Sequence, residues 1–193
     1  MMAERKGIKM KRYALSQADG IKEKYLKDQS RRLDYLTSHI KMKGEWYDAG
    51  KNSGHVRRYL ATYYDKAPDV YSLDLNYSLS KYIEDNVYDT ITHLEVIEHL
   101  LNPLLNMQEC YRMLKPGGVM YLTTPNDYSF IFKLEHLLER KFVDHFHQFN
   151  EFELVWLLDA AGFTIKKIKT FKKTNRRFIA RFCNNSFFVE AIK

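Results

Sequence analysis

The chain has 193 residues, of which 45% are hydrophobic and 15% aromatic, so it is long enough for a sizeable core and too apolar for a disordered chain. It contains no apolar run near the roughly 20 residues that a membrane-spanning helix needs, and its basic N-terminus lacks the apolar segment of a secretory signal. The length predicts a single domain over 1–193. Two cysteines cannot form a disulfide framework, so we expect a cytoplasmic protein.

The net charge of +7 is concentrated in two stretches of the chain. Residues 1–44 carry 12 Lys and Arg side chains against 5 acids, and residues 166–181 carry 8 basic side chains and no acid. These stretches have two interpretations: ordinary solvated surface, or attraction to an anionic partner such as nucleic acid or another phosphate-bearing molecule. The sequence shows no nucleic-acid-binding motif, so both interpretations remain open.

The first half of the chain predicts a basic, partly helical segment over 1–44, which leads into an α/β core over 45–193. Apolar residues at helical spacing, alternating residues at strand spacing and glycines between them define the elements. In chain order these are a helix at 21–42, a strand at 45–50, a helix at 55–64 and a strand at 69–75. Only the short segment 76–87 separates the last of them from the next strand.

The middle of the chain has the pattern of a βαβ-like unit. We expect a buried strand at 89–94, a short helix from Glu95, a second helix at 104–114, a turn at 115–118 and a strand at 119–123. Such units build open parallel sheets whose ligand sites lie at the carboxyl ends of the strands. Functional residues should therefore follow Leu94 and Thr124.

The last part of the chain predicts the other edge of the sheet. We expect helices at 130–140 and 151–161, the second ended by Gly162, and strands at 163–171, 178–182 and 186–192. The last strand is expected to pair antiparallel with its neighbour. We assign Trp156, Leu157 and Phe163 to the core.

A loop with two glycines follows the first predicted strand. It begins at Asp48, contains Gly50, and ends at Gly54, where a helix starts. Such a strand–turn–helix lets the backbone approach a ligand and directs helix N–H groups toward it. An acidic residue at the end of the next strand, Asp74, is suited to accept hydrogen bonds from a ribose diol. Ordinary turns also supply this glycine spacing, so the loop alone is weak support for a ligand site.

Several of these segments resemble one enzyme family. The loop D-A-G-K-N-S-G at 48–54 resembles the D-x-G-x-G-x-G loop of class I S-adenosylmethionine-dependent methyltransferases, with Asn52 in the place of the middle glycine. The runs E-V-I-E-H-L, L-K-P-G-G and T-T-P-N within 95–126, and the segment 145–163, resemble later motifs of its type 11 and ubiquinone-biosynthesis-like branch. The resemblance covers 45–171 and implies a Rossmann-like, mostly parallel sheet flanked by helices, with an antiparallel C-terminal edge.

The resemblance also implies an activity and a cofactor. A methyl group would pass from S-adenosylmethionine to an acceptor, for which we expect a small molecule with a nucleophilic oxygen, nitrogen or carbon. The enzyme would act mainly by positioning and desolvating the reactants. The residues that would bind the cofactor are Asp48, Gly50, Asn52, Gly54, Asp74 and the backbone of His93 and Leu94.

The segment 76–87 is too short for the helix and strand that the family usually places there, since a crossover alone takes roughly 10–12 residues. We therefore expect a sheet reduced by about one strand–helix unit. Either Asp74 ends the second strand and binds the ribose, or it belongs to the third strand and lies nearer the adenine. The shortening and Asn52 leave open an alternative function, that of a non-catalytic binding or regulatory protein with a degenerate cofactor site.

Glu95, Glu98 and His99 stand at positions i, i+3 and i+4, which places them on one face of the predicted helix. The run resembles the divalent-cation site of ubiquinone-pathway O-methyltransferases and of small-RNA 2′-O-methyltransferases, which add a downstream histidine, here His145. A cation bound there would hold two hydroxyl oxygens and favour a hydroxyl acceptor. Two other interpretations remain open: a structural helix start, and general-base catalysis by His99 or His145.

Overall fold

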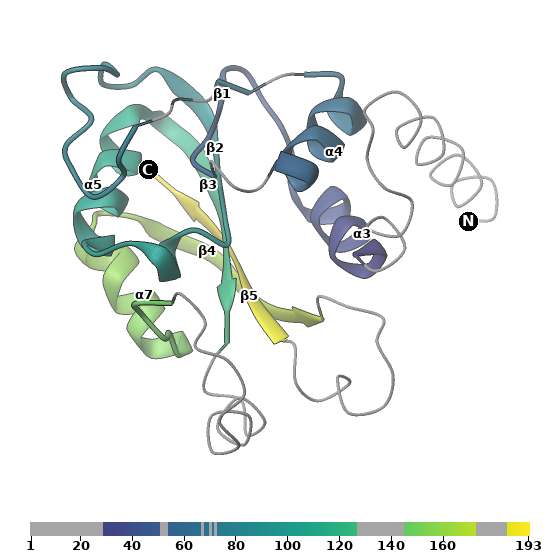
Figure 1. Ribbon diagram of the computed structural model, residues 1–193. Helices are drawn as coiled ribbons and strands as arrows, with labels where there is room; N and C mark the ends of the chain where they lie inside the picture. The colour runs from purple at the N-terminus through teal and green to yellow at the C-terminus, as the bar shows by residue number, and fades with distance from the viewer. Residues whose placement is uncertain are drawn as a thin grey trace.

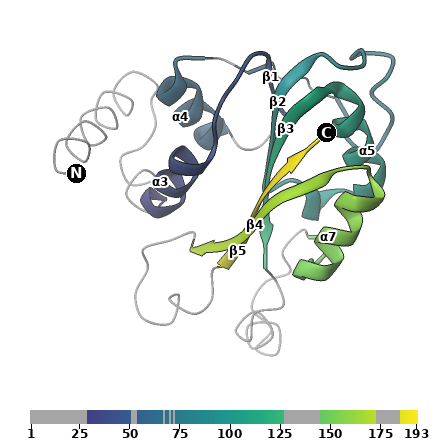
Figure 2. The ribbon, with the colours of Figure 1, turned by 180° about the vertical axis from the view of Figure 1, so that it is seen from behind.

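The computed structural model describes residues 29–50, 54–66, 68–69, 71, 73–126, 145–172 and 185–193. In this part of the chain, five strands form one sheet in the order β1-β2-β3-β5-β4 (Figures 1 and 2). The strands are β1 (Trp46–Asp48), β2 (Tyr88–Leu94), β3 (Leu114–Pro125), β4 (Thr164–Lys172) and β5 (Asn185–Ile192). The helices are α3 (Ser30–His39), α4 (Gly54–Tyr64), the single 3₁₀ turn η1 (Ile97–His99), α5 (Pro103–Met113) and α7 (Glu151–Ala160).

The sheet is mixed. β1, β2 and β3 run parallel to one another, whereas β5 runs antiparallel to both of its neighbours, β3 and β4. Parallel neighbours need crossover connections, which α4 with the segment after it supplies between β1 and β2, and η1 with α5 supplies between β2 and β3. The predicted α/β fold and its antiparallel C-terminal edge are confirmed.

The two faces of the sheet pack against different helices. α3 and α4 cover one face, and α5 and α7 cover the other, which gives three layers (Figures 1 and 2). Side chains alternate along β2, so Ile91 joins the apolar cluster under α5 and α7, while Leu94 joins the cluster under α3 and α4. Both faces of the central strands are therefore buried, as parallel strands require.

The helix α3 occupies the second part of the helix predicted at 21–42, whose beginning, 21–28, lies outside the described residues. It ends at His39, earlier than predicted. Leu33 and Leu36 are buried as their spacing predicts. The helices predicted at 55–64 and 104–114 are confirmed as α4 and α5.

The helix α7 corresponds to the helix predicted at 151–161, and Asn150 forms a capping box at its start. Leu157 and Phe163 are buried as expected. The assignment of Trp156 to the core is wrong, because 61% of this residue is exposed. It lies two positions after Leu154, which is roughly 200° around a helix, so one of the two faces the sheet and the other faces away.

A glycine turn and a salt bridge join the starts of the parallel strands. Gly44 has a φ of +47°, and a Cβ there would overlap the side chain of Asp89, so this turn requires glycine. The Asp89 carboxylate accepts from the Glu45 N–H (2.8 Å) and from Lys115 Nζ (2.6 Å). The turn predicted at 115–118 lies inside β3 as an irregular segment at which the register against β2 shifts.

The strand predicted at 69–75 is largely wrong. Among its described residues only Asp69 pairs, in a single parallel bridge to Tyr47 of β1, flanked by backbone hydrogen bonds of 2.7 and 3.0 Å. Residues 73–87 then form turns and irregular structure up to β2. Because Asp69, the residue that pairs with β1, precedes Asp74 by five positions, the bridge favours the alternative in which Asp74 follows the second strand.

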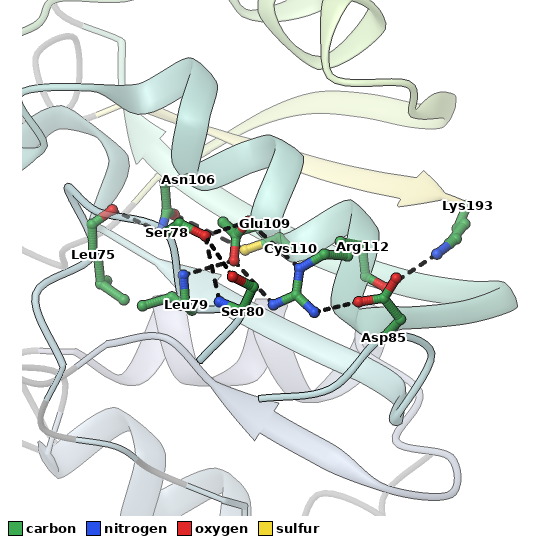
Figure 3. A network of polar contacts seen from close by, with 10 residues as sticks. All are labelled: Leu75, Ser78, Leu79, Ser80, Asp85, Asn106, Glu109, Cys110, Arg112 and Lys193. Atoms are coloured by element: carbon green, nitrogen blue, oxygen red, sulfur yellow. Dashed lines mark hydrogen bonds and ion pairs between the residues drawn. The ribbon is translucent and has the colours of Figure 1, made fainter. Parts of the chain in front are cut away.

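Polar groups of α5 hold this short segment against the sheet (Figure 3). The carboxylate of Glu109, which is 7% exposed, accepts from the Leu79 N–H (2.7 Å) and forms an ion pair with Arg112 (2.9 Å). Arg112 also pairs with Asp85 (2.6 Å). These contacts fix both ends of the segment that replaces the expected strand and helix.

Two predicted elements, the helix at 130–140 and the strand at 178–182, lie outside the described residues. The strands predicted at 163–171 and 186–192 are confirmed as β4 and β5. Within the described ranges, no helix combines the length and the apolar character that crossing a membrane would require.

Candidate functional site

The glycine loop and the turn with the two glutamates open onto the same edge of the sheet. Asp48, the last residue of β1, lies opposite Thr92 of β2, and Leu94 lies opposite Thr123 of β3. The backbone continues in register past the strand ends, since the Glu95 N–H donates to the Thr123 carbonyl (2.8 Å). The carboxyl ends of three parallel strands thus form one rim, which is where α/β sheets bind ligands.

Asp48 is buried at the start of the glycine loop. Thr92 Oγ1 donates to its Oδ1 (2.6 Å) and accepts from Trp46 Nε1 (2.9 Å). Arg57 Nη1 lies 3.8 Å from Asp48 Oδ2 and donates to the Gly50 carbonyl (3.4 Å). The carboxylate therefore orients the loop from inside the protein. The remaining predicted loop residue, Asn52, lies outside the described residues.

Gly54 is the first residue of α4, as the strand–turn–helix pattern predicts. The helix follows β1 directly through the loop, so its N-terminal N–H groups lie at the carboxyl rim. Backbone N–H groups at such a position favour a negatively charged ligand group.

Asp74 is exposed and belongs to a turn at the same rim. Its Oδ1 accepts from the backbone N–H (3.0 Å) and from Nδ2 (2.9 Å) of Asn76. Asn76 Oδ1 in turn accepts from the N–H groups of Leu101 (2.6 Å) and Asn102 (3.3 Å), in the loop after η1. These bonds tie the acidic turn to the loop that follows β2.

The side chain of His93 faces the interior. Asn106 Nδ2 donates to the Leu75 carbonyl (3.1 Å), so Asn106 Oδ1 is left to accept from His93 Nε2 (2.9 Å). Burial lowers the pKa of His93 to about 4, so the imidazole is neutral at physiological pH. His93 and Leu94, whose side chain is also buried, could therefore meet a ligand only through their backbone, and their contact with the cofactor stays a prediction.

Glu95, Glu98 and His99 do not share a helix face, and this prediction is wrong. Glu95 has a φ of +58° and precedes η1, which spans only Ile97–His99. The Glu98 carboxylate is 1% exposed and accepts from Thr124 Oγ1 (3.1 Å), which lies at the end of β3. The left-handed residue after β2 turns the chain sharply, so Glu98 points toward the neighbouring strand.

A different trio gathers at this point. The ligand atoms of Glu98, His99 and His145 lie within 4.8 Å of one another, and the rings of the two histidines lie 4.8 Å apart, edge to face. His99 Nε2 is 4.0 Å from Glu98 Oε1. His145 reaches the site because the N–H groups of the next two residues donate to the Glu98 carbonyl (2.8 and 3.2 Å). A buried carboxylate and two imidazoles suit a divalent metal ion such as Zn²⁺ or Mn²⁺.

A family model described as a methyltransferase domain matches residues 21–168, which is more than half of the chain. The chain therefore belongs to the S-adenosylmethionine-dependent methyltransferase family, as the resemblance of its motifs implies.

Curated relatives match only in part. The chain is 30% identical over 131 residues to a protein of Mycolicibacterium smegmatis described as a probable S-adenosylmethionine-dependent methyltransferase, with 64% of this chain and 50% of that protein covered. It is 26% identical over 117 residues to the ubiquinone biosynthesis O-methyltransferase of Xanthomonas campestris, with 49% of each covered. The chain thus spans about half the length of these relatives.

Solved structures share the fold over nearly the whole chain. A SAM-dependent methyltransferase from Archaeoglobus fulgidus superposes with a TM-score of 0.66 at 15% identity, covering 94% of this chain and 99% of that one. A SAM-dependent methyltransferase from Thermotoga maritima gives a TM-score of 0.63 at 16% identity, covering 95% and 98%. At these identities the likeness shows the fold.

Several residues that shape the rim were not predicted from the sequence. Thr92 donates to Asp48 and accepts from Trp46, and Asn76 and Asn106 tie the short segment to the loops beside it. Strand alternation places Thr92 on the same face as Leu94, but nothing in the sequence pairs it with Asp48. Such partners come from strands or helices that are distant in sequence, so the spacing of residues along the chain cannot predict these contacts.

Proposed function

We propose that this chain transfers a methyl group from S-adenosylmethionine to a hydroxyl oxygen of an acceptor at the carboxyl rim of β1, β2 and β3. The observation that carries the proposal is the parallel register, Asp48 opposite Thr92 and Leu94 opposite Thr123, which brings the glycine loop and the Glu98 turn to one rim. Donor and acceptor must meet within contact distance, so a shared rim is the minimum requirement for transfer.

The cofactor side of the rim is formed by the loop after β1 and by Asp74. Gly50 lets the backbone approach the ligand, the first turn of α4 supplies N–H groups, and the exposed carboxylate of Asp74 accepts from ribose hydroxyls. When bound, S-adenosylmethionine supplies a methyl group that is activated by the positive sulfur. Asp48 is buried beneath the loop and positions it, since its hydrogen bond with Thr92 and its ion pair with Arg57 keep the start of the loop in place.

The acceptor side is formed by Glu98, His99 and His145. An acceptor oxygen attacks the methyl carbon with its lone pair, the carbon–sulfur bond breaks, and its electron pair remains on the sulfur. The hydroxyl proton has to leave, and an imidazole nitrogen of His99 or His145 can accept it. The Xanthomonas relative is named as an O-methyltransferase, which supports a hydroxyl acceptor for this chain.

The same trio also fits a divalent cation. The donor set of Glu98, His99 and His145 replaces the set with Glu95 that the sequence predicts. A cation there would lower the pKa of a coordinated hydroxyl. Titration with Mn²⁺ or Zn²⁺ should show weaker binding by about tenfold in Glu98→Gln and by less than about twofold in Glu95→Gln. A larger loss of metal affinity in Glu95→Gln than in Glu98→Gln would support the set of Glu95, Glu98 and His99 that the sequence predicts. Equal affinities in both variants and the wild type would show that no cation binds at this trio.

A second candidate is a non-catalytic protein with the same fold. The observation that favours it is the absence of a regular strand at 73–87, where the described residues form turns and irregular structure. This shortening removes part of the wall that would cover the adenine. Isothermal titration separates the two candidates, since saturable binding of S-adenosylmethionine favours the transferase and its absence favours the binding protein.

Substitutions at the rim test the site itself. Asp74→Asn should weaken the binding of S-adenosylhomocysteine by about tenfold, because hydrogen bonds to a charged group are the stronger ones. Asp159→Asn, a matched change at an exposed acid on α7, should leave the affinity unchanged. Gly50→Val should abolish binding by adding bulk to the loop. Unchanged affinity in Gly50→Val and Asp74→Asn would show that the cofactor lies elsewhere.

A further inference from the structure

A cavity of about 440 Å³ lies on the α3 side of the sheet, away from the carboxyl rim. Its floor consists of Thr90 on β2, Val119 and Tyr121 on β3, and Glu190 on β5. Thr90 precedes Leu94, at the rim, by four residues, which corresponds to roughly 13 Å along a strand. The cavity is therefore separate from the site proposed for methyl transfer.

The chain that follows α3 forms one wall. The Lys41 N–H donates to Tyr121 Oη (3.1 Å), and the Lys43 N–H donates to Thr90 Oγ1 (3.1 Å). The Thr90 hydroxyl donates back to the Lys43 carbonyl (2.9 Å). Because these bonds fix the backbone on the sheet, Lys41 and Lys43 line the cavity together, next to His39.

The strand β4 forms another wall through a β-bulge. Ile165 pairs with Ala191 and Lys167 pairs with Glu190, which leaves Lys166 as an extra residue. A bulge interrupts the alternation of side chains between the two faces of a strand. Two consecutive lysines, Lys166 and Lys167, consequently line the same cavity.

Four lysines from two distant basic stretches thus surround one space with a single acid, Glu190, in its lining. Glu190 forms an ion pair with Lys166 (3.2 Å). Within the described residues, Lys41, Lys43 and Lys167 form no ion pair with an acid. Positive charges gathered in this way repel one another, and an anion bound between them converts the repulsion into attraction.

We propose that this cavity binds a phosphate-bearing small molecule of about nucleotide size. Lysine ammonium groups bind phosphate as point charges, and the volume falls in the range of small-molecule sites, roughly 300–1,000 Å³. The cavity favours the second interpretation of the basic stretches, because lysines from both stretches line the same space. RNA is the other source of phosphates, but four lysines around a space of about 440 Å³ fit a single small phosphate-bearing molecule better than an extended phosphate backbone.

Titration calorimetry with pyrophosphate and with ATP tests the proposal, at low salt and without S-adenosylmethionine. The wild-type chain should bind one equivalent of each. Lys43→Gln and Lys167→Gln should each weaken binding by about fivefold, whereas Lys81→Gln, a matched change at an exposed turn, should change it by less than about twofold. Glu190→Gln should strengthen binding by about threefold, because it removes the one negative charge in the lining.

Three results would overturn the proposal: no saturable binding of either probe, equal weakening by Lys81→Gln, or unchanged affinity in Glu190→Gln. A single-stranded RNA that binds while pyrophosphate does not would also overturn it, and would assign the charge to an open RNA-binding surface. Each of these results leaves the proposed methyl transfer untouched, because pyrophosphate lacks the adenosine that the rim would bind and the substituted residues lie away from the rim.

Discussion

The two sides of the carboxyl rim are built in different ways. On the side of β2 and β3, the strands pair from Thr90 to Leu94 without interruption, and backbone hydrogen bonds fix the turn that carries Glu98. On the side of β1, a strand of three residues meets a single bridge at Asp69. On the β1 side, hydrogen bonds to side chains such as Glu109 hold the chain in place, whereas strand pairing holds it on the other side. A segment held by a few side chains should respond much more strongly to single substitutions.

The largest effect is expected at Glu109. Glu109→Ala should lower the free energy of unfolding by about 3 kcal/mol, because it leaves the buried Leu79 N–H without its acceptor and Arg112 without its closest buried acid. Urea denaturation measures the change. Asp85→Asn, at a side chain that is 65% exposed, removes the other acid of Arg112 and should cost less than about 1 kcal/mol. Equal losses in both variants would contradict the comparison.

The next effect concerns His93, which connects the two sides through Asn106. Its pKa in the folded chain is about 4, below the ordinary value of 6.5, so between these values the unfolded chain binds a proton that the folded chain does not. Stability should be complete above about pH 6.5 and fall by about 3 kcal/mol as the pH drops toward 4. The variant His93→Gln keeps a donor for Asn106 and should flatten this dependence. The same pH slope in both proteins would refute the role of His93.

Gly44 tests the turn that leads into β1. Gly44→Ala should destabilise the chain by about 2 kcal/mol or more, because the new Cβ meets the Asp89 side chain and φ is +47°. Gly117→Ala is the control, since its φ of +76° is equally strained but its Cβ meets nothing within 4 Å. Thermal unfolding should show the smaller loss for Gly117→Ala. If the two variants lose the same stability, the contact with Asp89 does not matter.

The smallest effect separates two threonines of the rim, Thr92 on β2, which contacts β1, and Thr123 on β3. Thr92→Val should cost about 1–2 kcal/mol and weaken cofactor binding, because Thr92 donates to Asp48 and accepts from Trp46. The buried hydroxyl of Thr123 has no hydrogen-bond partner among the described residues, so Thr123→Val should be neutral or stabilising. Chemical denaturation and titration calorimetry measure both variants. A larger loss for Thr123→Val would reverse the comparison.

The sequence predicted best those elements whose signal is local. The alternation in 163–171 and the helical spacing in 104–114 agree with β4 and α5, because one-sided burial leaves a periodic pattern. The apolar run at 186–192 agrees with β5, whose consecutive residues Phe187, Phe188 and Val189 are all buried. The arrangement of the rim also followed from sequence, since parallel strands place their carboxyl ends together.

The failures have physical causes that lie outside local spacing. Periodicity placed Glu95 in a helix, but Glu95 adopts a left-handed conformation because the chain turns sharply after β2. The alternating run at 69–75 has strand propensity, yet only Asp69 finds a neighbouring backbone to pair with. Trp156 looked like core because it is apolar, while the orientation of α7 depends on which of its faces meets the sheet. The approach of His145 to Glu98 requires a return of the chain that no spacing rule predicts.

The single bridge at Asp69 has a consequence for how the chain folds and fluctuates. Partners in β1 and β2 are separated by 44 positions in sequence, so this pairing closes a long loop, whereas β2, α5 and β3 assemble from neighbouring segments. We expect the β1 edge to dock late during folding and to detach first in the native state, with amide exchange fastest there. A ligand bound across that edge would slow the exchange of β1 and leave β3 and β5 unaffected.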